Sequence, residues 1–412
     1  MDESIEPLDL VVRGGRVVDP GQNVDDVLDV GVRYGRIAVL GKDLSQLVAP
    51  TRLEYPPDLG TTVIDARGKL VVPGLVDLHA HVYTGVCPLT VAADEACLSS
   101  GVTTVASAGD AGANTIEGFR RLIVEPSRTR VVAFLHISTI GLTGWPEGEA
   151  HELAYLDVDK AVRAALENAD IVVGIKVREQ APLIVADHGL EPVRRAVEAG
   201  SRAGLPVMVH IGGAPTRLAE VMDLLRPGDI ITHCFTAAGN GLTEDNEVVP
   251  EAWEARERGI VFDVGHGFGS FAYGVAEPAV AAGFWPDTIS TDLHSLSASG
   301  PVGNLPRTMS KFLALGMPLH DVISAVTTRP AMVIGRSDTV GSLAVGRTAD
   351  VTVLETSEEE VSFVDSTGER RSGSTSLRVV STLRAGIPWV APMLHPAPAT
   401  GNRNYLDLRA AR

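Results

Sequence analysis

Six residues of the kinds that serve in catalytic metal sites each stand at the end of a short apolar run in this 412-residue chain. The runs are rich in β-branched residues and nearly free of polar side chains until their last positions, which is typical of strands buried in a parallel sheet. Because parallel strands end at one edge of their sheet, the six side chains are expected to face a common site. They are His79, His81, Lys176, His210, His233 and Asp292.

The middle of the chain alternates between such runs and segments with helical periodicity, for example 159–167 and 191–200. This alternation indicates parallel βα units. Eight units within 73–335 match the size of a (β/α)8 TIM-type barrel, which places active sites at the carboxyl ends of its strands. An open doubly wound sheet is the alternative, but it would scatter the six residues over two faces. The predicted strands are 75–79, 103–108, 130–137, 170–176, 206–210, 229–233, 260–265 and 288–292.

The two ends of the chain have a different texture of short alternating segments separated by glycine and proline. This texture is typical of strands and turns. The two ends are expected to pair into one small β-sandwich beside the barrel. The predicted organisation is therefore 1–72 for the first part of the sandwich, 73–335 for the barrel, and 336–412 for the second part and a tail.

Charge and composition limit the classes of molecule that the protein can be expected to bind. A formal net charge of −17 argues against nucleic acid, which is bound by clustered lysine and arginine. The acidic N-terminus does not resemble a secretory signal, and no apolar run reaches the roughly 18 residues that span a bilayer. Three cysteines without CxxC spacing fit a reducing compartment. We expect a cytoplasmic protein with a small-molecule, anionic substrate, no membrane partner, and a homo-oligomeric state as the default.

The histidines predict a metal centre. His79 and His81 are two apart on a strand, so both side chains leave the same face and can reach one ion. A single pair of this kind is weak evidence, but His210 and His233 at further strand ends strengthen it. Mixed imidazole and carboxylate ligation suits Zn²⁺, with Mn²⁺, Co²⁺ and Fe²⁺ also compatible.

Lys176 and Asp292 extend the prediction to two metal ions. Burial of Lys176 in its apolar run lowers the pKa of the amine, and a neutral amine can react with carbon dioxide to give a carbamate that bridges two cations. A snorkelling or salt-bridged lysine is the alternative. Asp292 is the candidate catalytic residue, a metal-bound carboxylate that moves a proton to the leaving group. Its alternative role is a helix N-cap or a structural acid.

The motifs Pro73-Gly-Leu-Val-Asp-Leu-His-Ala-His81, Gly174-Ile-Lys176, Val209-His210, Thr232-His233 and Ser290-Thr-Asp292 resemble the amidohydrolase superfamily in its binuclear form with a carboxylated lysine. The resemblance covers the barrel and the split sandwich. It implies that His79, His81, Lys176 and Asp292 hold the more buried metal. It also implies that Lys176, His210 and His233 hold the more exposed metal, and that a bridging hydroxide attacks a carbonyl.

The phrases Gly174-Ile-Lys-Val-Arg178, His233-Cys-Phe-Thr236 and Ser290-Thr-Asp-Leu-His-Ser295 are similar to a dihydroorotase-like group within that superfamily. Members of the group are associated with deacetylation of small α-acyloxy or N-acyl carboxylic acids such as acetyl-(R)-mandelate. The resemblance thus implies a hydrolase of an ester or amide of a small carboxylic acid. Two alternatives stay open: a cyclic amidase of the dihydroorotase or hydantoinase kind, and a non-catalytic scaffold, which would have gaps in its ligand set.

Three further residues are candidate substrate contacts. Arg178 lies two residues beyond Lys176, so it shares its inward direction and could grip a carboxylate; a surface salt bridge with Glu179 or with a loop acid is the alternative. His294 has the same relation to Asp292. His266 lies on a glycine-rich loop after the seventh strand. Of the remaining polar residues, Asp77 is expected to orient a ligand or to cap the barrel floor, and His136 to be an ordinary polar residue without an identifiable partner.

Overall fold

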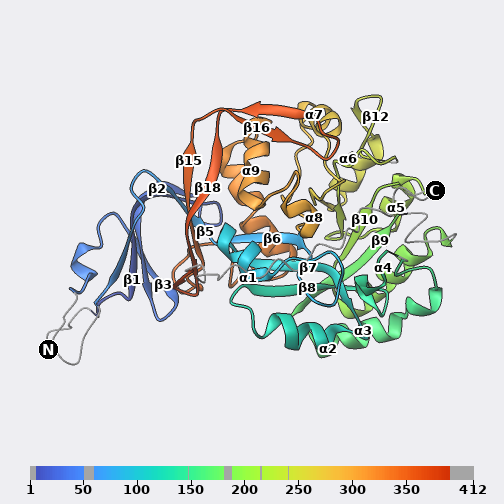
Figure 1. Ribbon diagram of the computed structural model, residues 1–412, viewed down its shortest axis with the longest axis horizontal. Helices are drawn as coiled ribbons and strands as arrows, with labels where there is room; N and C mark the ends of the chain where they lie inside the picture. Colours follow the sequence, from blue (N-terminus) through green and yellow to red (C-terminus); the bar gives the residue numbers. More distant parts are fainter. Residues whose placement is uncertain are drawn as a thin grey trace, which may run out of the picture.

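The computed structural model describes residues 6–50, 60–146, 148–180, 188–213, 216–239 and 241–389. Its larger part is a parallel sheet with the strand order β14-β11-β10-β9-β8-β7-β6, which curls into a barrel with helices outside it (Figure 1). The strands are β6 (Leu75–Ala80), β7 (Val102–Gly112), β8 (Arg130–His136), β9 (Val172–Glu179), β10 (Val207–Ile211), β11 (Ile230–Thr232) and β14 (Val261–Asp263).

The eighth predicted strand, 288–292, is an extended segment that joins the two edges of this sheet. Bridges pair Thr288 with Asp263 on β14 and Leu293 with Ala80 on β6, both in parallel. The backbone N–H of His81 also donates to the carbonyl of Leu293 at 2.8 Å. The segment therefore closes the barrel, and the predicted TIM-type fold is confirmed, with seven regular strands and one irregular eighth strand.

Helices cover the outside of the barrel, and local sequence explains where they begin and end. The Asp157 side chain accepts from the Lys160 N–H at 3.0 Å and caps α3, while Gly204, with φ 68°, ends α4 in the left-handed region. Figure 1 shows α2, α3 and α4 along one side of β7, β8 and β9. The helices are α1 (Ala93–Ala96), α2 (Ile116–Phe119), α3 (Val158–Glu167), α4 (Glu191–Ala203), α5 (Leu218–Leu224), α6 (Pro250–Glu257), α7 (Tyr273–Ala281), α8 (Ser295–Ala298), α9 (Leu305–Ala314), α10 (Leu319–Ala325) and α11 (Thr328–Val333).

Shorter helical turns lie between these elements. They are η1 (Ser45–Leu47), η2 (Leu98–Ser100), η3 (Arg120–Val124), η4 (Gly141–Gly144) and η5 (Leu153–Tyr155). Within the described ranges, no helix is both long and apolar enough to cross a bilayer.

A second, mixed sheet is built from both ends of the chain, in the order β19-β18-β15-β5-β1-β2-β3, with β4 also paired to β1. The junction between the ends is the antiparallel pair of β5 and β15, in which Val71 faces Val353. Buried valines and leucines from both ends share one apolar cluster. Its strands are β1 (Leu10–Asp19), β2 (Val24–Arg33), β3 (Arg36–Gly41), β4 (Thr62–Asp65), β5 (Leu70–Pro73), β15 (Val351–Ser357), β18 (Ser376–Arg384) and β19 (Ile387–Pro388).

Two small hairpins complete the fold, β12 (Thr243–Glu244) with β13 (Glu247–Val248) and β16 (Val361–Val364) with β17 (Arg370–Gly373). The second hairpin reaches back to the barrel, where Arg371 pairs with Glu277 on α7 at 2.5 Å. The polypeptide passes from the mixed sheet into the barrel at Gly74, between β5 and β6. The domain limits predicted at 73 and 335 stay a prediction, and parts of the predicted end segments, 1–5, 51–59 and 390–412, lie outside the described residues.

Candidate metal centre

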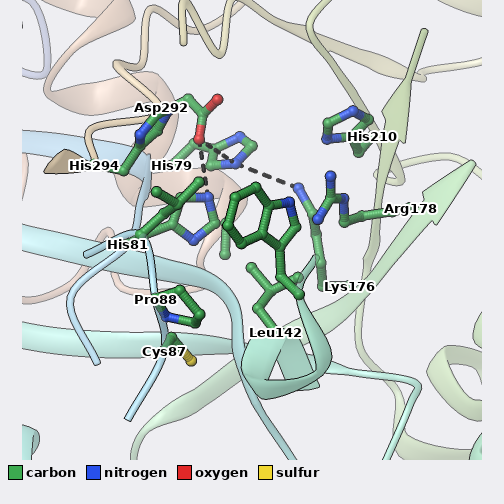
Figure 2. Close-up of a pocket in the computed structure, with 13 residues that line it drawn as sticks. His79, His81, Cys87, Pro88, Leu142, Lys176, Arg178, His210, Asp292 and His294 are labelled. Atoms are coloured by element: carbon green, nitrogen blue, oxygen red, sulfur yellow. Dashed lines mark hydrogen bonds and ion pairs between the residues drawn. The ribbon is translucent and has the colours of Figure 1, made fainter. Parts of the chain in front are cut away.

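The six predicted residues meet at the carboxyl ends of the barrel strands. Figure 2 shows all of them except His233. His81 Nε2 lies 2.9 Å and His79 Nε2 lies 3.4 Å from Oδ1 of Asp292. The amine of Lys176 lies 3.5 Å from Nε2 of His79. A second pair stands beside this group, since Nδ1 of His210 and Nε2 of His233 are 2.9 Å apart.

Two of these residues have unusual backbone conformations. His233 has a φ of 70° and Asp292 a φ of 47°, in the left-handed region that non-glycine residues rarely adopt. Such strained positions persist where the surrounding structure fixes them, and they gather at functional sites. The loop after β14 fits closely against them, because a Cβ on Gly267 would lie 2.4 Å from Oδ2 of Asp292.

Hydrogen bonds select the tautomer of His79. Its Nδ1 lies 2.9 Å from the Thr232 hydroxyl, and that hydroxyl donates to Oδ2 of Asp263 at 2.8 Å. The hydroxyl proton is thereby used, so His79 must donate from Nδ1. The lone pair of Nε2 then faces Asp292 and Lys176, as a metal ligand requires.

The same logic applies to two other histidines. Nδ1 of His81 lies 2.6 Å from a carboxylate oxygen of Asp110, and Nδ1 of His233 lies 2.6 Å from the carbonyl of Gly265. Both acceptors favour a proton on Nδ1, which leaves Nε2 of each ring available as a ligand. An acceptor behind a metal-binding histidine is the usual arrangement in metal sites.

Burial and charge shift the pKa values of this group. Burial lowers the pKa of Lys176 to about 7 and that of His233 to about 4. Burial would also lower the pKa of His81, but Asp110 and Asp292 reverse this effect and raise it to about 9. The negative potential that favours a proton between His81 and Asp292 favours a cation there as well.

The donor atoms fit a divalent metal. Ligand atoms of His79, His81 and Asp292 all lie within 4.8 Å of one another. Two imidazoles and one carboxylate form a set that suits zinc and related ions. His210 lies on the other side of Lys176 (Figure 2), and together with its neighbour His233 it adds two more nitrogen donors.

Two of the three candidate substrate contacts line the same pocket. Arg178 enters it from β9, and its nearest carboxylate is the loop acid Glu149 at 3.6 Å, one of the two kinds of partner that the sequence left open, and not Glu179. His294 lines it beside Asp292, and its Nδ1 is buried with no hydrogen-bond partner in the described part of the chain. The remaining wall is mainly apolar, from Cys87, Pro88, Leu89, Ala108, Leu142 and Trp145.

His266 lies away from the pocket lining. It is fully buried, and Nε2 accepts from the amine of Lys311 at 2.6 Å. Its Nδ1 lies 2.9 Å from the carbonyl of Gly267, and its ring stacks on Phe271 with centroids 4.7 Å apart. This histidine supports the loop after β14, in which Gly267 packs against the Asp292 carboxylate.

Sequence reasoning missed three buried acids near the site. Asp110 holds His81, Asp263 holds Thr232 and Ser290, and Glu149 lies behind Arg178. The first two stand at the ends of β7 and β14, and that position was an available signal. Glu149 lies in a loop, where no periodicity points to it. Asp77 is a supporting residue, as expected, and accepts from the N–H and hydroxyl of Thr291 at 3.0 and 2.5 Å.

The fold and the donor set together define a metal-dependent barrel hydrolase. Models described as "Amidohydrolase family" match residues 62–174 and 274–382. A deacetylase of Agrobacterium fabrum is 39% identical over 350 residues, which cover 84% of this chain and 82% of that protein.

Solved structures agree with this assignment. An adenine deaminase superposes with a TM-score of 0.84 at 30% identity, covering 93% of this chain and 99% of that one. A dihydroorotase superposes with a TM-score of 0.83 at 34% identity, covering 92% and 98%. The chain belongs to the amidohydrolase superfamily, as the sequence motifs predicted.

Proposed function

We propose that this protein is a deacylase that removes an acetyl or similar acyl group from a small carboxylic acid by hydrolysis of an ester or amide bond. The similarity to the Agrobacterium fabrum deacetylase over most of both chains carries the proposal. The pocket supports it, because apolar Leu142 and Trp145 line it together with Arg178 and the metal-binding side chains. Such a pocket suits a small organic anion.

The proposal includes two divalent cations, zinc being the first candidate. His79, His81 and Asp292 would hold one ion, and His210 and His233 the other. Lys176, carboxylated by carbon dioxide, would serve both. A pKa of about 7 supports this, because a substantial fraction of the amine is then neutral and reactive at neutral pH. When bound, the cations lower the pKa of a water molecule and polarise the substrate carbonyl.

The protein's own groups then move the proton and hold the substrate. Burial would raise the pKa of Asp292, but His81 outweighs it and holds that pKa below its usual range. Asp292 is therefore ionised and can take a proton from the attacking water and pass it to the leaving oxygen or nitrogen. Arg178 pairs with a carboxylate of the substrate, and His294 offers its unpartnered Nδ1 to the leaving group.

A cyclic amidase is the second candidate, because a dihydroorotase structure is 34% identical with a TM-score of 0.83. The scaffold alternative has less support, since it requires gaps in the ligand set and all six positions are filled. A cytoplasmic location and a homo-oligomeric state stay predictions from the sequence.

The test is an assay of protein loaded with zinc in the presence of bicarbonate. O-acetyl hydroxy acids and N-acetyl amino acids are compared with dihydroorotate and hydantoins. The proposal expects turnover of acyclic acyl acids, about two metal ions per chain, and a carbamate signal after labelling with ¹³C-bicarbonate. Turnover of the ring substrates alone would replace it with the cyclic amidase.

A further inference from the structure

A buried carboxylate behind the pocket has no ordinary partner. Glu149 is 0% exposed, and neither of its side-chain oxygens has a hydrogen-bond partner among the described residues. The nearest nitrogen atoms are Nε2 of His136 at 3.5 Å and Nε of Arg178 at 3.6 Å, and these two nitrogens lack a hydrogen bond as well. Buried polar atoms are almost always paired, so these four neighbouring atoms without hydrogen bonds require an explanation.

The hydrogen-bond network fixes the charges in this cluster. The Ser138 N–H donates to Nδ1 of His136 at 3.0 Å, so a neutral His136 carries its proton on Nε2, directed at Glu149. Burial raises the pKa of Glu149, but the charge of Arg178 and the contact with His136 outweigh it and leave that pKa lowered. Glu149 is therefore an anion held by one cation and one neutral donor.

The guanidinium of Arg178 joins this cluster to the pocket. Its Nε edge faces Glu149, while Figure 2 shows the guanidinium reaching the pocket interior beside Lys176. Nη2 makes only a long contact, 3.3 Å, to the side chain of Gln180. An arginine held at its Nε edge presents the other edge, with two parallel N–H groups, to a planar carboxylate.

One segment supplies both the acid and the apolar wall. Leu142 in η4 and Trp145 line the pocket, and Glu149 follows four residues after Trp145. The same loop therefore sets where the body of a substrate packs and how Arg178 is oriented.

We propose that Arg178, Glu149 and His136 form a subsite for the free carboxylate of the substrate, with Glu149 as the positioning residue that orients the guanidinium. The proposal rests on the proposed function and deepens it, because it adds Glu149 and His136 as the groups that orient Arg178 toward the substrate carboxylate. The 3.6 Å spacing matters, because Glu149 orients Arg178 without the short ion pair that would compete with a ligand.

The test compares a carboxylate with the amide of the same shape. Binding of phenylacetate and phenylacetamide to zinc-loaded protein is measured by calorimetry, which needs no turnover. Glu149→Gln is expected to weaken phenylacetate binding about tenfold, because the guanidinium of Arg178 loses the charge that orients it. Phenylacetamide binding should change less than about twofold on the same energy scale. Glu152→Gln, an exposed acid of the same segment, is the matched control and should change neither.

A double variant separates positioning from a general structural role. Once Arg178→Gln has removed the guanidinium, adding Glu149→Gln should cause no further loss of phenylacetate binding. Thermal unfolding reports whether each variant is folded, and His136→Asn provides a second, milder change that should weaken phenylacetate binding in the same direction.

Several results would overturn the subsite. One is an equal loss of affinity for phenylacetate and phenylacetamide in Glu149→Gln. A second is a double variant in which the two losses of phenylacetate affinity add. A third is phenylacetate affinity that Arg178→Gln leaves unchanged because the metal ions alone bind the carboxylate. A protein that hydrolyses no acyl acid but shows carboxylate selectivity dependent on Glu149 would keep the subsite and refute the deacylase.

Discussion

The hydroxyl of Thr232 lies 2.9 Å from Nδ1 of His79 and links that histidine, through a chain of two hydrogen bonds, to a carboxylate that His79 does not contact. The acid is Asp263 on β14, whose Oδ2 accepts a hydrogen bond from the Thr232 hydroxyl at 2.8 Å. A neutral side chain between the two therefore sets the tautomer of a metal ligand. The relay connects β6, β11 and β14 across the barrel interior.

Replacement of Thr232 tests this relay. Thr232→Val keeps the shape but removes the acceptor for His79, leaving a buried N–H unpaired. We expect zinc affinity to fall by about 10-fold to 100-fold, the range seen when supporting partners of metal ligands are lost. Thr232→Ser keeps the hydroxyl and should bind zinc nearly as the parent does. Competition with a chelator measures both, and equal affinities for the two variants would contradict the relay.

Asp110 should matter for a similar reason at His81. Its Oδ1 accepts from His81, while Oδ2 accepts from the N–H of Val82 and the hydroxyl of Ser107 at 2.7 Å each. Asp110→Asn cannot serve both sides, because its NH₂ group must face either His81 or the other donors. We expect zinc affinity to fall at least about tenfold. Ser107→Ala, which removes one donor and leaves the His81 contact, is the control and should retain most of the affinity.

Gly109 leaves room for Lys176. Its φ is 92°, and a Cβ there would lie 2.7 Å from Cγ of Lys176 and 2.9 Å from Cδ2 of His136. Gly109→Ala should therefore push Lys176 away and lower kcat/KM by about 100-fold, as small displacements at a reacting centre can. Gly316→Ala isolates the backbone contribution, since its φ is also 92° and nothing lies within 4 Å of its Cβ position.

Both variants should lose roughly 1 kcal/mol or more of folding stability from the positive φ alone. Only Gly109→Ala should lose activity. If Gly316→Ala were equally inactive in assays at matched folded fraction, the steric account of Lys176 would be wrong.

Much of the site could be predicted because a buried parallel strand tolerates polar side chains only near its end. A histidine, lysine or aspartate that ends an apolar run is therefore conspicuous, and this signal located His79, Lys176 and Asp292. The number of such runs also predicted the barrel. The irregular eighth segment was found in the same way, although its pairing is limited to two bridges.

The supporting residues were harder to predict because their roles depend on partners remote in sequence. Asp110 lies beyond the predicted end of its strand at 108, since β7 continues through small residues to Gly112. Glu149 lies in a loop, and no sequence periodicity predicts that the loop brings it next to Arg178. The glycine pattern around His266 could not reveal that Lys311, 45 residues later, donates a hydrogen bond to Nε2 of its ring.

Glu179, at the end of β9, should make stability depend on pH. Burial raises the pKa of this carboxyl to about 7, although the Thr216 hydroxyl donates to Oε1 at 2.9 Å. Between the unfolded pKa of about 4.5 and the folded value of about 7, the unfolded chain releases a proton that the folded chain keeps. The stability that Glu179 contributes is thus complete below the lower pH and is lost as pH rises through the higher one.

Glu179→Gln removes this titration and keeps an acceptor for Thr216. The free energy of unfolding of the variant, relative to that of the parent protein, should therefore rise by about 2 kcal/mol from pH 4.5 to pH 8, after allowance for solvent screening. Urea unfolding of both metal-free proteins at several pH values measures the difference. A difference that stays constant with pH would show that Glu179 is ionised in the folded protein at neutral pH, and that water or a nearby cation compensates its charge.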